Sequence, residues 1–165
     1  MTVLRDQLLA GRAVAVRGSV ARAVWDALAE LGATLQDDRA RVLVYDAAGA
    51  FASGGRAGLR AAIDCGWEAI LEVAAEWATE DAGASGAGKI VLITPRPAAG
   101  PFAAPAARAL ENLARTLSVE WARFGVSTTV IVPGHDEESL AELVCFLASE
   151  AGDYFSGCRF ELRGR

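Results

Sequence analysis

The sequence predicts an α/β protein whose sheet is largely parallel, and three observations lead to this fold class. Short apolar runs that suit buried strands alternate with longer segments in which apolar residues recur at helical spacing. The run 90–93 contains no polar residue, which is typical of a strand covered by helices on both faces. The chain has 165 residues, a length that is most economically one domain over residues 1–165.

Each expected element rests on its own pattern of apolar and turn-forming residues. Gly32 stops the first helix, Pro105 lies in the first turn of a later one, and Pro133-Gly134 closes a strand. A flexible loop is expected over 83–88, where glycine, alanine and serine predominate. The expected strands are 13–16, 42–45, 90–93, 126–132 and 158–162. The expected helices are 20–31, 59–78, 105–124 and 139–149.

Charge and hydropathy exclude several classes of function. The formal net charge is −5 and the pI is about 4.9, which argues against nucleic acid as a principal partner. No apolar run approaches the roughly 20 residues that a membrane-spanning helix needs. The N-terminus lacks the long apolar segment of a secretory signal, so a cytoplasmic protein is expected. All basic residues except Lys89 are arginines scattered along the chain, which indicates a solvated surface rather than a phosphate-binding array.

The apolar content and the cysteines further limit the expected environment of the chain. Hydrophobic residues make up 53% of the chain and the mean hydropathy is +0.27, which indicates either a thoroughly buried sheet or a surface reserved for another subunit. Cys65, Cys145 and Cys158 are far apart and lack CxxC spacing. Free thiols in a reducing compartment are therefore expected, rather than disulfides or a zinc site. No metal site is predicted.

Five stretches of the chain are similar to short-chain dehydrogenases/reductases. They are residues 9–16 (LAGRAVAV), 27–33 (ALAELGA), 88–93 (GKIVLI), 115–122 (RTLSVEWA) and 146–150 (FLASE). The stretches are spread over nearly the whole chain, and the resemblance implies an abbreviated Rossmann-like three-layer fold. It also implies NAD(P) as the cofactor of active relatives, and an oligomer formed through two long helices.

The segments that bind the cofactor in this family are shortened here. Residues 16–22 stand where the family has a TGxxxGxG loop, and they are too few to form it. Only Gly18 and Ser19 remain to offer backbone amides to a phosphate, so this junction is either a residual anion site or a simple turn. After residue 38 the chain proceeds at once to the strand that resembles the family's fourth, and residues 45–49 (YDAAG) replace the NNAG turn. The resemblance therefore implies that the adenosine half of the nucleotide site is missing.

The positions of the family's catalytic residues hold other side chains. In the alignment, Ala103 stands at the Tyr position and Ala107 at the Lys position. Thr94 or Pro95 stands at the Ser position, and Gly66 at the Asn position. The neighbouring Phe102 and Arg108 offer no replacement, because phenylalanine does not ionise and arginine does not release its proton. His135 is the only histidine of the chain. It either acts as a base together with Asp136, or belongs to the exposed loop at the start of the last helix. We therefore predict no catalytic residue.

The two long predicted helices are apolar on more than one face. They are either ordinary core helices, or helices buried on one side by the sheet and on another by a second subunit. We expect the second arrangement, as a homodimer or as a hetero-oligomer with a full-length homologue. The expected interface residues are Ile63, Trp67, Ile70, Ala74, Trp77, Ala106, Ala109, Leu113 and Trp121.

Three functions remain open from the sequence. The first is a non-catalytic subunit, without a cofactor of its own, that pairs with an active short-chain dehydrogenase/reductase and supports it. The second is an atypical NAD(P)-dependent oxidoreductase acting on a hydroxyl or keto substrate, and the third is a module that binds a small ligand or acyl group. The lost motifs argue against the second, and the retained helices favour the first over the third. The candidate cofactor-binding residues are Arg17, Gly18, Ser19, Asp46 and Thr94.

Overall fold

The structure is a computed structural model that describes residues 4–78 and 88–163. Its centre is one sheet of six strands in the order β2-β1-β3-β4-β5-β6, and every neighbouring pair runs parallel. The strands are β1 (Ala13–Gly18), β2 (Thr34–Leu35), β3 (Val42–Asp46), β4 (Lys89–Ile93), β5 (Ser127–Val132) and β6 (Arg159–Glu161). The expected α/β class with a parallel sheet is confirmed.

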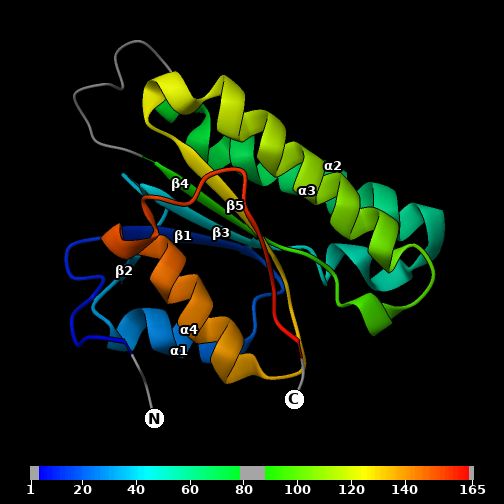
Figure 1. The fold of residues 1–165 in the computed structure, drawn as a ribbon, viewed down its shortest axis with the longest axis horizontal. Helices are drawn as coiled ribbons and strands as arrows, with labels where there is room; N and C mark the ends of the chain where they lie inside the picture. Colours follow the sequence, from blue (N-terminus) through cyan, green and yellow to red (C-terminus); the bar gives the residue numbers. More distant parts are fainter. Residues whose placement is uncertain (1–3, 79–87, 164–165) are drawn as a thin grey trace.

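Helices cover both faces of the sheet, which gives the expected Rossmann-like three-layer fold (Figure 1). Helices α1 and α4 pack together on one face, and α2 and α3 pack together on the other. The helices are α1 (Arg22–Glu30), α2 (Gly55–Ala74), α3 (Ala103–Glu120) and α4 (Glu137–Ala148). Short 3-10 helices are η1 (Ala50–Ser53), η2 (Ala75–Ala78), η4 (Pro97–Ala99), η5 (Ala122–Phe124) and η6 (Glu150–Gly152). Within the described ranges, no helix is long and apolar enough to cross a membrane.

The sheet separates two apolar clusters, because successive side chains of a strand point to opposite faces. Leu43 and Tyr45 of β3 belong to the cluster under α2 and α3, whereas Val42 and Val44 belong to the cluster under α1 and α4. Every residue of β3 and β4 is buried. This burial on both faces explains the uninterrupted apolar runs in the sequence.

Two elements differ from the sequence-based expectation. Strand β2 was not expected, because two residues are too few to show a strand period; Thr34 N–H donates to the Arg12 carbonyl at 2.8 Å. Helix α2 begins at Gly55, ahead of the expected residue 59, within a glycine-rich stretch that ends at Gly58. A Cβ on Gly58 would lie 2.7 Å from the Phe51 carbonyl oxygen, so glycine there lets η1 pack against the helix. The loop expected over 83–88 lies outside the described residues, apart from Gly88.

Parallel strands give the sheet two chemically different edges. We call the strand ends around Gly18, Asp46 and Ile93, which are register partners, the C-terminal edge. The strand starts around Val42 and Lys89, also partners, form the N-terminal edge. In Figure 1 the N-terminal edge lies on the left and the C-terminal edge on the right. Open α/β sheets ordinarily bind ligands at the C-terminal edge.

Candidate functional site

Four of the five candidate cofactor-binding residues lie at the C-terminal edge. Gly18 is the register partner of Asp46, and Asp46 is the partner of Ile93, which Thr94 follows directly. Ser19 comes after Gly18 and leads into α1. The topology therefore assembles most of the candidate residues where a Rossmann-like fold would use them.

The fifth candidate, Arg17, is held by acidic side chains from two other segments. Its Nη1 donates to Asp37 Oδ1 at 2.7 Å, and its Nε lies 3.5 Å from Glu72 Oε2 of α2. Hydrogen bonding between Arg17 and Asp37 raises the pKa of the guanidinium and lowers the pKa of the carboxyl. The charge of Arg17 is therefore already balanced by two carboxylates.

The junction after β1 is closed against the end of β3. A Cβ on Gly18 would overlap the Asp46 carbonyl oxygen, and a Cβ on Gly49 would overlap the Ser19 hydroxyl. Gly18 has a φ of +82°, which glycine adopts without steric cost. Ser19 N–H donates to the same Asp46 carbonyl at 3.4 Å. The chain itself thus fills the space between these two turns, and the junction forms a simple strand-to-helix turn.

Asp46 places a buried carboxyl group at this edge. The residue is 6% exposed, and its Oδ1 accepts a hydrogen bond from Ala48 N–H at 2.8 Å. Burial raises the pKa of Asp46 to about 6, while the hydrogen bond from Ala48 and the nearby charge of Arg96 act in the opposite direction. At neutral pH the carboxyl is mostly ionised, so it sets a negative charge beside the junction where a phosphate would have to lie.

The positions equivalent to the family's catalytic residues hold no acid or base. Ala103 is buried and Ala107 is half-buried. Thr94 is buried, and its hydroxyl donates to a backbone carbonyl at 3.1 Å. A Cβ on Gly66 would lie 3.1 Å from Tyr45 Cε1, so the Tyr45 ring fills the space beside the Asn position. None of these four positions can exchange a proton with a substrate.

Tyr45 and His135 do not replace the missing groups. Tyr45 is buried in the core, its hydroxyl donates to the Ala62 carbonyl at 3.2 Å, and burial raises the pKa of the phenol. His135 is exposed in the turn before α4. The adjacent Asp136 caps that helix by accepting a hydrogen bond from Glu138 N–H at 3.1 Å. This geometry agrees with the helix-start interpretation of His135.

A small cavity of about 290 Å³ lies between the turns that follow β3 and β4. Its lining residues are Ala48, Phe51, Ala52, Pro95, Arg96 and Ala99. Arg96 is the charged residue of this lining, and its Nη2 forms an ion pair with Glu137 at 3.5 Å. The volume is at the lower limit of the roughly 300–1,000 Å³ that small-molecule sites occupy.

The nine residues expected at a subunit interface divide between the core and the surface. Four are buried within this chain, which corrects the expectation that they form an association surface: Ile70, Ala74, Trp77 and Ala106. The Trp77 ring lies so close to Gly88 that a Cβ on Gly88 would overlap it. Helices α2 and α3 pack on each other as well as on the sheet. Each helix therefore buries part of its second apolar face within this chain. Trp67 is 40% exposed, and the half-buried members are Ile63, Ala109, Leu113 and Trp121.

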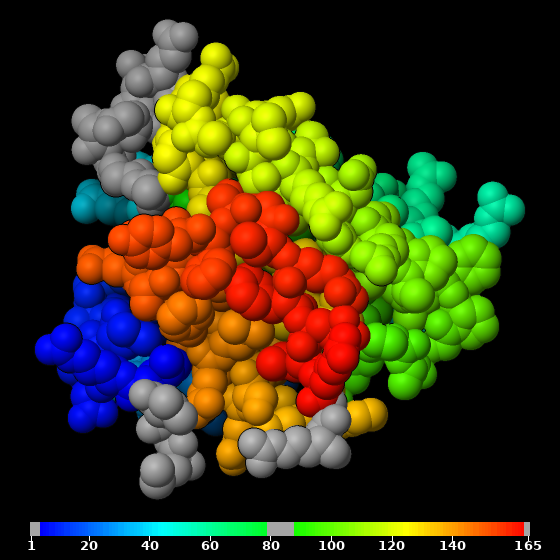
Figure 2. Space-filling view, in the orientation of Figure 1, coloured from blue at the N-terminus to red at the C-terminus, as the bar shows by residue number. Residues whose placement is uncertain are grey.

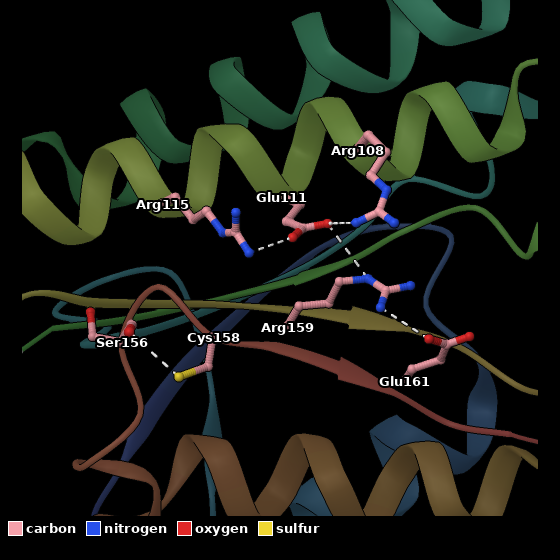
Figure 3. Close-up of polar contacts among 7 residues, drawn as sticks. All are labelled: Arg108, Glu111, Arg115, Ser156, Cys158, Arg159 and Glu161. Carbon is pink, nitrogen blue, oxygen red and sulfur yellow. Dashed lines mark hydrogen bonds and ion pairs between the residues drawn. The ribbon is translucent and has the colours of Figure 1, made fainter.

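A buried carboxylate that sequence reasoning missed connects α3 to the last strand (Figure 3). Glu111 is 5% exposed and forms ion pairs with Arg108 at 2.7 Å, Arg115 at 2.8 Å and Arg159 of β6 at 3.5 Å. Arg159 also pairs with Glu161 at 3.0 Å. Arginines three residues before and four residues after Glu111 were the available signal. Because three guanidiniums surround the carboxylate, this cluster holds β6 against α3 rather than offering a free charge.

Comparisons with known proteins agree with the fold. No protein-family model matches the sequence, and no curated protein is significantly similar to it. A citronellol catabolism dehydrogenase from Pseudomonas aeruginosa PAO1 is 19% identical, with a TM-score of 0.74 over 99% of this chain and 98% of that chain. A hydroxysteroid dehydrogenase from Escherichia coli is 16% identical, with a TM-score of 0.77 over 96% of this chain and 98% of that chain. A short-chain dehydrogenase/reductase mutant from Serratia marcescens is 17% identical, with a TM-score of 0.70 over 95% of this chain and 98% of that chain. This chain therefore has the fold of the short-chain dehydrogenases/reductases, as its sequence resemblance implied.

Proposed function

We propose that this chain is a non-catalytic subunit that associates with a full-length enzyme of the same fold. The observation that carries the proposal is the closed junction at the C-terminal edge. Gly18 and Ser19 pack directly onto Asp46 and Gly49, in the place where a dinucleotide-binding protein keeps an open glycine loop. A chain with this junction retains the scaffold of an oxidoreductase without the space for its cofactor.

The residues at this edge do not fit NAD(P). The candidate amides belong to a turn that is filled by the chain's own atoms, and the nearby Asp46 carboxylate repels phosphate at neutral pH. The adjoining cavity of about 290 Å³ is lined mainly by alanine, phenylalanine and proline. Arg96, the cation of this lining, is already paired with Glu137, so neither feature supplies free cationic or amide donors for a pyrophosphate group. No hydride-transfer step is therefore assigned to this chain.

The chain also lacks the side chains that transfer a proton in active relatives, and this loss does not depend on whether a cofactor binds. Ala103 and Ala107 stand in place of the tyrosine and lysine that exchange a proton with the substrate in active relatives. The hydroxyl of Thr94 is buried and already donates to a backbone carbonyl. Loss of general acid catalysis alone costs about 10²–10⁴ in rate. We therefore expect no dehydrogenase activity from the purified chain.

The α2/α3 layer supports association with another chain. Trp67 and Leu71 of α2 are 40% and 45% exposed, and Val119 of α3 is 77% exposed. Large apolar side chains on one layer are what a soluble protein ordinarily covers with a partner, and tryptophan is enriched among residues that dominate binding energy. Of the remaining expected interface residues, Ile63, Ala109 and Leu113 are half-buried on the same two helices, and Trp121 is half-buried at the C-terminal cap of α3.

Coexpression with a full-length dehydrogenase of this fold from the same genome tests the proposal. We expect a stable hetero-oligomer, with light scattering showing a mass greater than that of either partner by at least the 17.2 kDa of this chain. Trp67→Glu should abolish this complex, because it replaces an exposed apolar side chain of α2 with a charge. Trp25→Glu is the matched control, since Trp25 is 37% exposed on α1 in the opposite layer.

Two outcomes would contradict the proposed role. The first is a chain that remains monomeric with every full-length homologue of its genome. The second is a complex that Trp67→Glu and Trp25→Glu weaken equally, since the effect would then not depend on the α2/α3 layer. Trp77 is unsuitable for this test, because it is buried against Gly88 and its replacement would report on folding.

A further inference from the structure

A cavity larger than the one just described lies at the N-terminal edge of the sheet, opposite the edge discussed above. A cavity of about 650 Å³ is formed by residues 10–13 before and at the start of β1, the link from β2 to β3, the start of β4, and the turn around η6. In Figure 2 the blue segment before β1 and the orange segment near residue 150 meet on this side of the molecule. Its volume falls within the roughly 300–1,000 Å³ range of small-molecule sites.

The lining of this cavity is cationic although the chain as a whole is acidic. Its charged residues are Arg12, Arg39, Arg41, Lys89, Glu150 and Asp153, so four positive charges face two negative ones and the lining carries a net charge of +2. The whole chain has a net charge of −5. These basic residues are scattered in the sequence and come together only through the sheet register. The arginines were expected to form a solvated surface; Arg39 is indeed exposed, whereas Arg12 and Arg41 are half-buried and line this cavity with it.

Two of these cations retain donor capacity that the described part of the chain does not use. Lys89 is 3% exposed, and its Nζ lies 2.5 Å from Asp153 Oδ1. An ammonium has three donors, so one carboxylate oxygen leaves it able to bind a further acceptor. The Nη1 atom of Arg41 is buried and has no hydrogen-bond partner among the residues that the structure describes. A buried guanidinium nitrogen without an acceptor is costly, and this cost is removed when an anion binds.

The remaining charges of the cavity do not neutralise this excess. Arg12 is paired with Glu150 at 3.3 Å, and Asp153 is paired with Lys89. Within residues 4–78 and 88–163, neither Arg39 nor Arg41 forms an ion pair with a carboxylate. Arg39 is exposed at the mouth of the cavity, so it can reach a ligand that enters.

We infer that this cavity binds a small phosphate-bearing molecule, with Arg39, Arg41 and Lys89 as its donors. A guanidinium presents a planar pair of N–H groups that matches phosphate, and lysine adds a point charge. A phosphate monoester carries a charge of about −1.5 to −2 at neutral pH, which balances the +2 of the lining. The inference is independent of the proposed subunit role, since it concerns the opposite edge of the sheet.

Calorimetric titration of the full chain with inorganic phosphate and with pyrophosphate tests this inference, at ionic strength held constant with sodium chloride. We expect saturable binding. Arg41→Gln should raise the dissociation constant about tenfold or more, the effect of losing a charge-assisted hydrogen bond. Arg39→Ala, at an exposed position where folding is not at stake, should weaken binding in the same direction. Arg56→Ala is the matched control, because Arg56 is exposed on α2 and does not line the cavity.

The other results of this titration would overturn the inference. Saturable binding of citrate without binding of phosphate or pyrophosphate would show a carboxylate site instead. Equal affinity for phosphate in the wild type and in both cavity variants would place the anion elsewhere on the surface. An absence of saturable binding up to tens of millimolar phosphate, about the limit of a specific contact, would show that the cations serve only the fold.

Discussion

The two edges of the sheet have opposite character. At the C-terminal edge Gly18 packs onto Asp46, the cavity measures about 290 Å³ and the buried charge is negative. At the N-terminal edge the cavity measures about 650 Å³, and the buried charge of Lys89 is positive. The fold ordinarily places its ligands at the first of these edges. A chain can therefore keep the parallel sheet and both helical layers of a fold while its own atoms fill the junction that ordinarily holds a phosphate.

Two glycines at the ends of β1 provide the strongest test of this difference. Gly18 and Gly11 have nearly the same backbone conformation, with φ of +82° and +78°. A Cβ on Gly18 would overlap the Asp46 carbonyl. A Cβ on Gly11, which lines the open cavity, would have no atom within 4 Å from the described residues beyond its two chain neighbours. We expect Gly18→Ala to lower the free energy of unfolding by about 3–5 kcal/mol, from strain plus overlap. Gly11→Ala should cost about 1–2 kcal/mol, from strain alone.

Urea denaturation of both variants measures this difference directly. The conformational strain is common to the two positions. The additional loss of unfolding free energy in Gly18→Ala therefore reports how tightly the junction packs against β3. Equal losses of stability in the two variants would mean that the C-terminal edge is as open as the N-terminal edge.

The carboxyl of Asp46 should make stability fall as the pH rises. Burial raises the pKa of Asp46 from 3.8 to about 6, so between these pH values the folded protein binds more protons than the unfolded chain. The free energy of unfolding therefore decreases through this window, by about 3 kcal/mol at most. Asp46→Asn keeps an acceptor for Ala48 N–H and removes the titration. Its stability relative to the wild type should increase from pH 4 to pH 7, and a constant difference would contradict the assigned burial.

At the N-terminal edge, we expect Lys89→Met to separate stability from ligand binding. Burial lowers the pKa of Lys89, so burial disfavours the charged form of its side chain. Its partner Asp153 is exposed, so water can solvate that carboxylate when the lysine is removed. Replacing a buried ion-pair member with an apolar side chain should thus change stability by no more than about 1 kcal/mol, or increase it. Binding of inorganic phosphate should weaken in the same variant. A loss of stability above about 3 kcal/mol would assign Lys89 to the fold instead.

Most of the fold could be predicted from the sequence because its main elements are long and periodic. The apolar runs of β3 and β4 and the helical spacing in α2 and α3 reflect burial directly. Strand β2 could not be predicted, because Thr34 and Leu35 are one exposed and one half-buried residue without a repeating pattern. The start of α2 was obscured by Gly55 and Gly58, which the structure needs for a tight turn and for contact with Phe51.

The candidate sites were predicted less completely, because they depend on contacts between distant segments. Strand order alone brings Gly18 and Asp46 to one edge, but only the folded chain shows that their contact closes it. Arg41 and Lys89 are far apart in the sequence, so their convergence on one cavity has no local signal. Trp77 shows a further limit of helical spacing: an apolar stripe looks the same whether it faces the sheet or a second subunit.

The central claim, that the C-terminal edge does not hold a dinucleotide, is tested most directly by titrating the purified chain with NADH and NADPH. Nicotinamide fluorescence and tryptophan quenching report binding, and the same titration of Arg41→Gln removes any contribution from the cationic cavity. We expect no saturable binding tighter than about 1 mM in this variant. A micromolar dissociation constant that Arg41→Gln leaves unchanged would show instead that the C-terminal edge accepts the cofactor.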